Sequence, residues 1–184
     1  SSLRRRSQIL NANHDVRVHD IRGNVDTRLS KLDAGEYDAI ILASCGLDRL
    51  GLTDRIAERM AYSVVLPAAC QGIIAIEARA DDRDVLDLID TITNHETLIQ
   101  AETERAFVSA IEGGCRIPVG CLSVFDGDDV RIDGMVGSID GRTVIRRHVS
   151  GSLNFRVQLA RELASQLLDS GGSALLQVAA NDKN

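Results

Sequence analysis

One cysteine in this chain stands in a setting suited to covalent attachment. Residues 112–120 read Glu-Gly-Gly-Cys-Arg-Ile-Pro-Val-Gly, so Cys115 follows two glycines and precedes Pro118. Two glycines end a helix and permit backbone conformations closed to other residues, and a proline makes the chain extended or turning. A thiol on such an irregular loop is a candidate attachment point. The alternative is a small buried residue in a tight turn.

A cluster of basic residues near the start of the chain is suited to binding anions. Ser1 and Ser2 place hydroxyls and free backbone N–H groups at an expected helix start, beside the guanidinium groups of Arg4, Arg5 and Arg6. Helix N-termini favour anions, and arginine pairs with carboxylates through two parallel hydrogen bonds. The alternative is a set of surface arginines in weak ion pairs.

Three further arginines follow expected strands. Arg22 lies at the end of the strand predicted at Val16–Ile21, and Arg28 lies one turn into the following helix. Arg49 follows the continuous apolar run Asp38–Ala43, which is typical of a strand buried on both faces. Ligands gather at the carboxyl ends of strands in α/β sheets. We therefore expect these three side chains to converge on one cleft.

The first part of the chain alternates strands and helices, which favours an α/β unit with a largely parallel or mixed sheet. The expected strands are Val16–Ile21, Asp38–Ala43, Ser63–Leu66 and Ile73–Ala78. The expected helices run from Leu3 towards Asn11, from Asn24 to Gly35, and over Leu47–Leu50, Thr53–Met60 and Asp81–Ile92. Pro67–Gly72 is expected to be a hinge or crossover.

The second part predicts a small α+β domain. We expect a helix over His95–Ile111, capped by Asn94, and a later helix from about Asn154 to Leu168 that ends near Gly171-Gly172. The strands expected between these helices are Val119–Phe125, Val130–Ser138 and Thr143–Val149. The turns Asp126-Gly127 and Asp140-Gly141 are strong hairpin signals, so the three strands should form an antiparallel sheet.

The net charge of −6 hides a basic start in an otherwise acidic chain. Residues 1–31 contain seven basic and three acidic residues, a net charge of +4, which leaves −10 for the remainder. A local anion site fits this distribution better than a nucleic-acid surface, which would be more broadly basic. Aromatic residues make up 3% of the chain, too few to stack bases.

The cysteines and the hydropathy pattern indicate the setting of the protein. The four cysteines show neither Cys-x-x-Cys spacing nor disulfide-rich density, which favours a reduced, cytoplasmic environment. Cys115 and Cys121 have too few histidines near them for a zinc site, so we expect no metal. No apolar run approaches the roughly 20 residues of a membrane helix.

Several long blocks of this sequence resemble the porphobilinogen deaminase family, whose members are also called hydroxymethylbilane synthases. The blocks are SSLRRRSQ (1–8), IRGNVDTRLSKLDAGEYDAIILASCGLDRLGL (21–52), LPAACQGIIAIEAR (66–79), the NHET and ERAF segments within 94–107, and EGGCRIPVG (112–120). They occur in the family's order and extend over nearly the whole chain. Several independent blocks are more specific than one short motif.

The resemblance implies a covalent cofactor and the residues that bind it. In the family, the cysteine that matches Cys115 carries a dipyrromethane through a thioether bond. Gln71 and Gly72 match a loop at the cleft, and we expect them to contact the cofactor through backbone or amide groups. Arg6 matches a position where the family commonly has a non-basic residue, so we expect it to face solvent. The positions that bind carboxylates of the cofactor and of the growing pyrrole chain match Ser2, Arg4, Arg5, Arg22, Arg28 and Arg49.

The resemblance also implies a reaction. The family are transferases that condense four porphobilinogen molecules head to tail, with loss of ammonia, to give the linear tetrapyrrole hydroxymethylbilane in haem biosynthesis. Their catalytic Asp lies in a His-Ser-x-Lys-Asp-x-Pro motif that this sequence does not contain. We therefore expect a C-terminal portion of the enzyme that contains no catalytic residue and is inactive alone. The expected partners are porphobilinogen, the growing pyrrole chain and the missing N-terminal domain, and the full enzyme is expected to be a cytoplasmic monomer that binds neither nucleic acid nor membrane.

The expected domain organisation follows from the family. Residues 1–72 should form a partial periplasmic-binding-protein-like α/β domain, and residues 73–93 should belong to the missing first domain or link to it. Residues 94–179 should form the C-terminal α+β domain with the cofactor cysteine, followed by a tail at 180–184.

Two other hypotheses stay open on the residues alone. The α/β unit could be a non-catalytic anion-binding module, although such a module has no need of the loop at 112–120. The chain could also be a structural fragment that dimerises through Ile73–Ile76, since an apolar strand without a partner sheet favours association.

Overall fold

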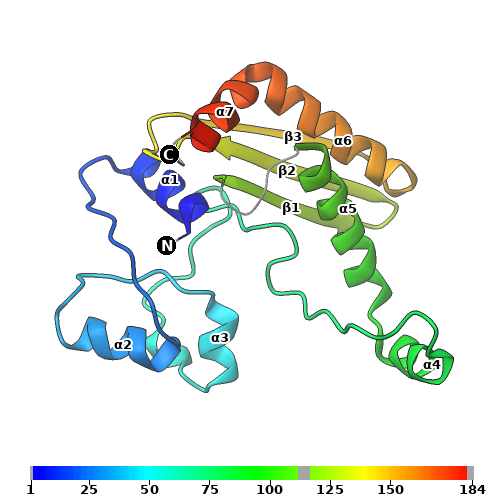
Figure 1. The fold of residues 1–184 in the computed structure, drawn as a ribbon, viewed down its shortest axis with the longest axis horizontal. Helices are drawn as coiled ribbons and strands as arrows, with labels where there is room; N and C mark the ends of the chain where they lie inside the picture. Colours follow the sequence, from blue (N-terminus) through cyan, green and yellow to red (C-terminus); the bar gives the residue numbers. More distant parts are fainter. Residues whose placement is uncertain (1, 112–116, 182–184) are drawn as a thin grey trace.

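The computed structural model describes residues 2–111 and 117–181, which form a mixed arrangement of helices and one antiparallel sheet (Figure 1). Within these ranges the sheet has three strands, β1 (Val119–Asp126), β2 (Asp129–Gly137) and β3 (Val144–Ser152), in the order β1-β2-β3. This confirms the prediction of a mixed helix-and-sheet protein with a three-stranded antiparallel sheet.

Both predicted hairpins form. Asp126 pairs with Asp129 at the end of the first hairpin, so Gly127 and Asp128 make its two-residue turn. Gly127 has a φ of +59° and Gly141, in the second hairpin, has a φ of +72°. In the first turn Gly127 has a positive φ and Asp128 does not, as in the type II′ hairpin turn, which has a glycine at its first central position.

The core of the C-terminal unit lies between the sheet and two long helices, α5 (His95–Ile111) and α6 (Arg156–Leu167) (Figure 1). Alternate residues of each strand face these helices, because successive side chains of a strand point to opposite faces. The side chains that are buried together are Phe107, Ile111, Cys121, Val130, Ile132, Val136, Ala160, Leu163, Ala164 and Leu167. This core is aliphatic apart from one phenylalanine and one cysteine, in keeping with the low aromatic content.

One helix at the end of the chain was not predicted. After α6, a π-helical turn, η3 (Leu168–Gly172), leads into α7 (Ser173–Asn181). The sequence Gly171-Gly172 predicts a helix end, and Gly171 does leave the helical region with a φ of +107°. The chain kinks there and then resumes as a helix.

Residues 2–92, as the structure describes them, contain five short helical elements. Their bounds are α1 (Leu3–Ala12), α2 (Val25–Asp33), α3 (Ser44–Arg49), η1 (Thr53–Arg55) and α4 (Arg83–Ile92). The first two helices are capped at their starts: the side chains of Ser2 and Asn24 accept hydrogen bonds from the backbone N–H groups of Arg5 and Thr27. The helix expected over Thr53–Met60 is reduced to the single turn of η1.

The four strands predicted before residue 80 are wrong for the described residues. Val16–Ile21, Asp38–Ala43, Ser63–Leu66 and Ile73–Ala78 do not pair with one another or with β1–β3. A strand exists only through ladder bonds to a neighbour, and an apolar pattern cannot supply that neighbour. The periplasmic-binding-protein-like sheet is therefore not formed here.

Side chains bond to the backbone of these segments instead. Gln8 does this most completely, because its amide oxygen accepts from the N–H of Leu66 at 2.8 Å and its amide nitrogen donates to the carbonyl of Leu66 at 3.1 Å. The guanidinium of Arg6 donates to the carbonyl of Val18 at 3.2 Å. These bonds meet part of the hydrogen-bonding need that a sheet would meet.

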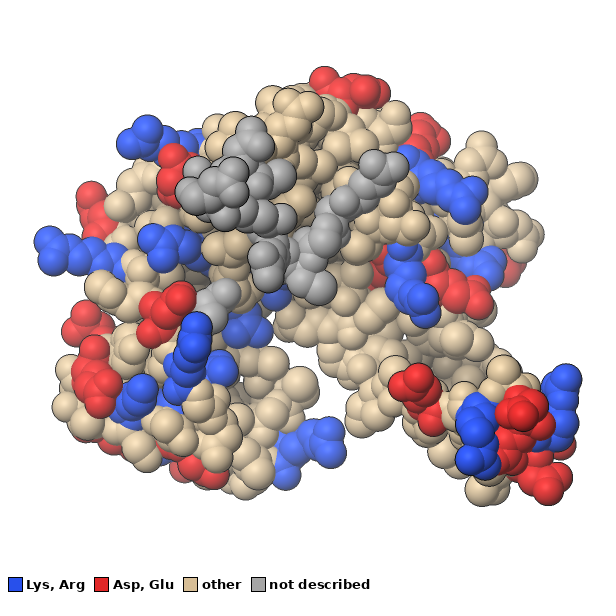
Figure 2. Space-filling view, in the orientation of Figure 1, with Lys and Arg blue, Asp and Glu red and all other residues tan. Residues whose placement is uncertain are grey.

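Helix α4 projects from the body of the molecule beyond the start of α5 (Figure 1). Charged side chains of both signs gather on it (Figure 2), and none of its residues is buried. Its apolar residues Leu88 and Ile92 are 66% and 68% exposed, and Ile74, in the preceding extended segment, is 75% exposed. None of the helices in the described ranges is both long and apolar enough to span a membrane.

Candidate functional site

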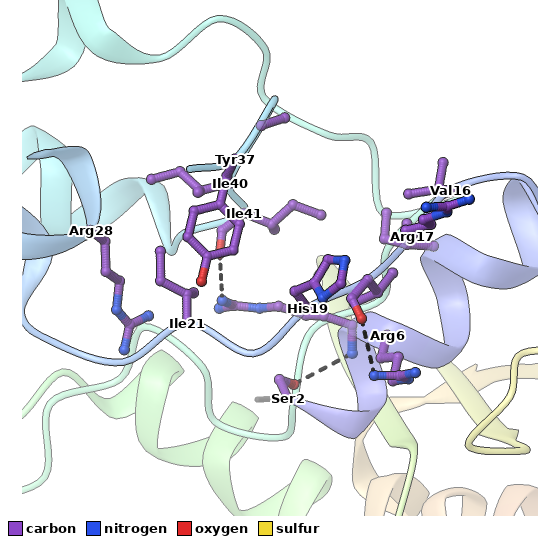
Figure 3. Close-up of a pocket in the computed structure, with 14 residues that line it drawn as sticks. Ser2, Arg6, Val16, Arg17, His19, Ile21, Arg28, Tyr37, Ile40 and Ile41 are labelled. Carbon is purple, nitrogen blue, oxygen red and sulfur yellow. Dashed lines mark hydrogen bonds between the residues drawn. The ribbon is translucent and has the colours of Figure 1, made fainter. Parts of the chain in front are cut away.

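A cavity of about 530 Å³ lies between the start of α1 and the two extended segments 16–21 and 37–41 (Figure 3). This volume is within the range of small-molecule sites. Its polar wall includes Ser2, Arg5 and Arg28, while Ile21 and Ile41 contribute apolar surface. The structure therefore brings together three of the residues that the sequence analysis selected.

The guanidinium of Arg5 has most of its donors available. It has five N–H groups, and within the described residues its one side-chain bond runs from Nη1 to the carbonyl oxygen of Ile41 at 3.1 Å. No carboxylate among those residues forms an ion pair with Arg5. Burial, and secondarily the positive charge of Arg28, lowers the pKa of Arg5. An anion in the cavity would relieve both effects.

Arg28 comes to the same cavity from helix α2. Its Nε donates to the carbonyl of Gly23 at 2.8 Å, which orients the guanidinium and leaves both Nη atoms without a hydrogen-bond partner in the part of the chain that the structure describes. Arg5 and Arg28 line one cavity together with Ser2, and neither has an acidic partner among the described residues. Such a pair of cations beside a hydroxyl is suited to carboxylates.

The expectation that Arg6 faces solvent is wrong. Arg6 is half-buried and lines the cavity, where its guanidinium donates to the carbonyl of Val18. The segment 16–21, in which apolar and polar residues alternate, folds back over α1 and contacts this side chain. The prediction for Arg6 was based on the residue type that the family commonly has at this position, which does not reveal the contact with Val18.

Arg4 occupies a different environment from Arg5. It is 7% exposed and is absent from the cavity wall. Its Nη1 donates to the carbonyl of Leu66, and its Nη2 donates to Oε1 of Gln71 at 2.8 Å. Burial, followed by the charge of Arg5, lowers the pKa of Arg4 to about 10. The structure thus places Arg4 against the segment that contains Gln71.

The remaining predicted residues do not meet at the cavity. Arg22 and Arg49 are exposed and lie outside its wall. Gly72 is exposed beside Gln71 and has a φ of +93°, a conformation that favours glycine. Cys115, the predicted attachment point of the cofactor, lies outside the described residues. We expected Arg22, Arg28 and Arg49 to converge on one cleft. Of these three arginines, Arg28 alone lines the cavity.

The sequence analysis did not select other residues that line the cavity. Arg17, His19 and Tyr37 all contribute to its wall. Arg17 and His19 lie in a segment that the sequence predicts as a strand, and Tyr37 lies in a predicted loop. These residues meet because both segments fold over α1. Among the described residues, no three His, Cys, Asp or Glu side chains gather as a metal site requires.

The cavity has arginine and serine donors and apolar walls, and no carboxylate of the described residues pairs with Arg5 or Arg28, so its chemistry suits small organic anions. Comparison with known families makes the assignment specific. Residues 1–87 match the family model described as "Porphobilinogen deaminase, dipyromethane cofactor binding domain". Residues 98–169 match the model described as "Porphobilinogen deaminase, C-terminal domain". The chain belongs to the porphobilinogen deaminase family.

Individual relatives agree with the two family models. The chain is 48% identical over 176 residues to the porphobilinogen deaminase of Roseiflexus castenholzii and equally similar to that of Roseiflexus sp. strain RS-1. It is 44% identical over 177 residues to the porphobilinogen deaminase of Exiguobacterium sp.. These alignments include 96% of this chain but 57–58% of each relative. The chain thus spans less than three fifths of the length of these relatives.

Proposed function

We propose that this chain is the C-terminal part of a porphobilinogen deaminase. With the N-terminal part of that enzyme, it joins four porphobilinogen molecules head to tail. The reaction consumes one water molecule and releases four ammonia molecules, and it gives hydroxymethylbilane for tetrapyrrole and haem biosynthesis. The observation that carries this proposal is the cavity of Arg5 and Arg28, which have no carboxylate partner within the described residues.

The chemistry of the cavity fits this class of substrate. Each porphobilinogen has an acetate and a propionate on its pyrrole ring, so every added unit brings two carboxylates. Arg5, Arg28 and Ser2 supply N–H and O–H donors for such groups, and the apolar side chains of Ile21 and Ile41 suit the faces of a pyrrole. Fixed cations inside a partly dry cavity hold carboxylates more strongly than exposed ones do.

The dipyrromethane, attached to the sulfur of Cys115 through a thioether, supplies the pyrrole end to which substrate units are joined. Ser2, Arg5 and Arg28 would hold its carboxylates. The sequence also predicts Arg4, Arg22, Arg49, Gln71 and Gly72 as contacts of the cofactor or of the growing chain, and we retain them in the proposal. Arginine keeps its proton at neutral pH, so these residues position and neutralise rather than donate protons.

The proton needed for the departure of ammonia therefore comes from outside this chain. In the proposed enzyme, the catalytic Asp belongs to the N-terminal part, and the C-terminal part is inactive alone. We further propose that residues 1–72 contribute to the second domain, that residues 73–93 join the first domain, and that residues 94–179 form the third. The complete enzyme is proposed to be a cytoplasmic monomer.

Intact mass tests the attachment. The full-length protein, denatured and free of small molecules, should be heavier than its sequence by two porphobilinogen units less two ammonia molecules. Cys115→Ser should remove this addition, while the control Cys45→Ser, at an exposed cysteine, should keep it. A full-length wild-type protein that consumes porphobilinogen but has the bare mass would contradict the proposed role of Cys115.

Consumption of porphobilinogen tests whether the C-terminal part needs the N-terminal part for activity. The 184-residue chain alone should consume none above the buffer rate, and the full-length protein should consume it and form hydroxymethylbilane. Steady turnover by the chain alone would overturn the claim that it is inactive. A full-length protein that binds organic anions through Arg5 but never consumes porphobilinogen would favour a non-catalytic binding module.

A further inference from the structure

Glu104, on helix α5, is a buried carboxylate that bonds to neutral donors from three segments. It is 2% exposed. Its Oε1 accepts from the N–H and the hydroxyl of Ser123 at 2.9 and 3.2 Å and from the amide of Gln100 at 3.1 Å. Its Oε2 accepts from the N–H of Cys70 at 2.6 Å. Among the described residues, no arginine, lysine or histidine forms an ion pair with it.

These bonds join helix α5, strand β1 and the segment that contains Cys70. Helix α5 precedes, and strand β1 follows, the stretch of sequence that contains Cys115. The third partner is the crossover segment, residues 66–72, which also bonds to β1 because the carbonyl of Pro67 accepts from the N–H of Cys121 at 3.0 Å. Glu104 therefore ties the crossover segment to the C-terminal unit.

The bond from Glu104 falls on a strained residue. Cys70 has a φ of +60°, which is uncommon for a residue other than glycine and costs of order 1 kcal/mol or more. Such a conformation persists only where the surroundings impose it. Cys70 is the third residue of a tight turn that closes through the bond from the N–H of Gln71 to the carbonyl of Ala68 at 3.1 Å. The carboxylate of Glu104 holds this turn in place by accepting the N–H of Cys70.

The crossover segment in turn bonds to the buried face of α1 and helps to hold its rotation. Arg4 donates to the carbonyl of Leu66 and to Oε1 of Gln71, and Gln8, one turn later, bonds to both backbone groups of Leu66. Both side chains lie on the buried face of α1. Arg5 follows Arg4 by one residue, or about 100° around the helix, and this rotation directs Arg5 into the cavity.

We propose that Glu104 is a positioning residue of the arginine cavity: it fixes the crossover segment, and so sets the rotation of α1 that presents Arg5 to a ligand. Glu104 touches neither the cavity nor its contents, and acts through Cys70, Gln71 and Arg4. That the ligand is a pyrrole carboxylate rests on the proposed function. The chain of contacts from Glu104 through Cys70 and Gln71 to Arg4 does not depend on it.

The test compares Glu104→Gln with Glu102→Gln. Glu102 lies on the same helix, is exposed and pairs only with Arg156 within the described residues, so it is the matched control for the same chemical change. In Glu104→Gln the amide places a donor against either the N–H of Cys70 or that of Ser123, which breaks one side of the link. Ser123→Ala is a milder variant that removes one donor to the same carboxylate, should Glu104→Gln fail to fold.

Hydrogen exchange and kinetics are measured on the full-length protein. In Glu104→Gln, the amide of Cys70 and the amides of α1 should exchange about tenfold faster, as expected for the loss of one hydrogen bond to a charged group. KM for porphobilinogen should rise about tenfold while kcat changes less than about threefold, since ground-state and transition-state binding are lost together. Ser123→Ala should show smaller changes in the same direction, and Glu102→Gln should show none.

The outcomes separate the proposal from the proposed function. Unchanged exchange at Cys70, or faster exchange at Cys70 with α1 unaffected, would overturn the positioning role. Faster exchange in both segments with an unchanged KM would overturn it as well, because Arg5 would then be presented correctly without the link. If the wild-type protein consumes no porphobilinogen, the proposed function fails. The rates of amide hydrogen exchange in α1 then decide by themselves whether Glu104 fixes the rotation of this helix.

Discussion

Arg146 and Gln8 are 138 residues apart in the sequence, and Nη2 of Arg146 donates to Oε1 of Gln8 at 2.7 Å. The same guanidinium donates to the carbonyls of Ser63 and Val64, so one side chain of β3 holds both α1 and the segment that leads to the crossover. Arg146 is partly buried at this contact, and this burial lowers the pKa of its guanidinium. Arg146 and Glu104 thus attach the first half of the chain to the C-terminal unit at two separate points.

Arg146→Ala should lower the free energy of unfolding by about 2 kcal/mol, because it leaves several acceptors without their donor. Arg146→Lys should recover part of the loss, since an ammonium keeps the charge without the planar fork. The control is Arg147→Ala, at an exposed neighbour whose guanidinium bonds to Ser170 and to one backbone carbonyl, and it should cost less than about 0.5 kcal/mol. Equal costs for the two alanine variants, measured by urea unfolding, would contradict the role of Arg146.

The cavity makes a prediction about loading of the cofactor. Arg5→Gln and Arg28→Gln should each weaken the binding of carboxylates about tenfold, because each removes charge-assisted hydrogen bonds. In the full-length protein this should appear as a reduced fraction of molecules with the added mass on Cys115. Arg83→Gln, on the projecting helix α4, is the control and should load fully. Full loading of the Arg5→Gln/Arg28→Gln double variant would exclude the cavity as the site.

Arg4 and Arg5 show what sequence alone could not separate. They are adjacent, identical in type and equally close to the helix start, and the family resemblance selects both. The structure buries Arg4 against Leu66 and Gln71 and turns Arg5 into the cavity. Their difference depends on the rotation of α1, which is set by a segment about sixty residues later in the chain. No local pattern contains that information.

The C-terminal unit was predicted well for the opposite reason. Its hairpins follow from Asp-Gly turns, its helix α5 follows from the cap at Asn94, and its strands pair with their sequence neighbours. In the first half, helices α1 and α2 formed where their caps indicated, but each expected strand needed a distant partner. An apolar run such as Asp38–Ala43 predicts burial, and burial does not specify a ladder.

Gly134 makes a prediction about the core of the C-terminal unit. A Cβ at this position would lie 2.9 Å from two ring carbons of Phe107 and 3.0 Å from Leu163, so Gly134→Ala should cost about 1–3 kcal/mol through overpacking. In a Phe107→Leu background the same change should cost less, since the ring carbons are gone. Gly46→Ala is the control, because among the described residues its Cβ would meet Val25 alone, at 3.8 Å, and it should be neutral or stabilising. Equal costs of Gly134→Ala in both backgrounds, by thermal or urea unfolding, would contradict the packing argument.

Two thiols predict how stability changes at alkaline pH. Burial, and then the charge of Glu104, raises the pKa of Cys70, and the same causes raise the pKa of Cys121 well above its ordinary value. Above the ordinary thiol pKa of about 8.5, the thiols of the unfolded chain lose their protons. In the folded state the same thiols stay protonated to higher pH, so the folded state binds more protons than the unfolded state in this range. Stability is therefore complete below that pH and falls as pH rises beyond it. In reducing buffer, the urea midpoint should fall between pH 7.5 and 9.5, and Cys70→Ala/Cys121→Ala should show a flatter profile. The loss of one buried and one partly buried sulfur should also lower the midpoint of the double variant at every pH. A double variant with the same slope as wild type would assign the pH dependence to other groups.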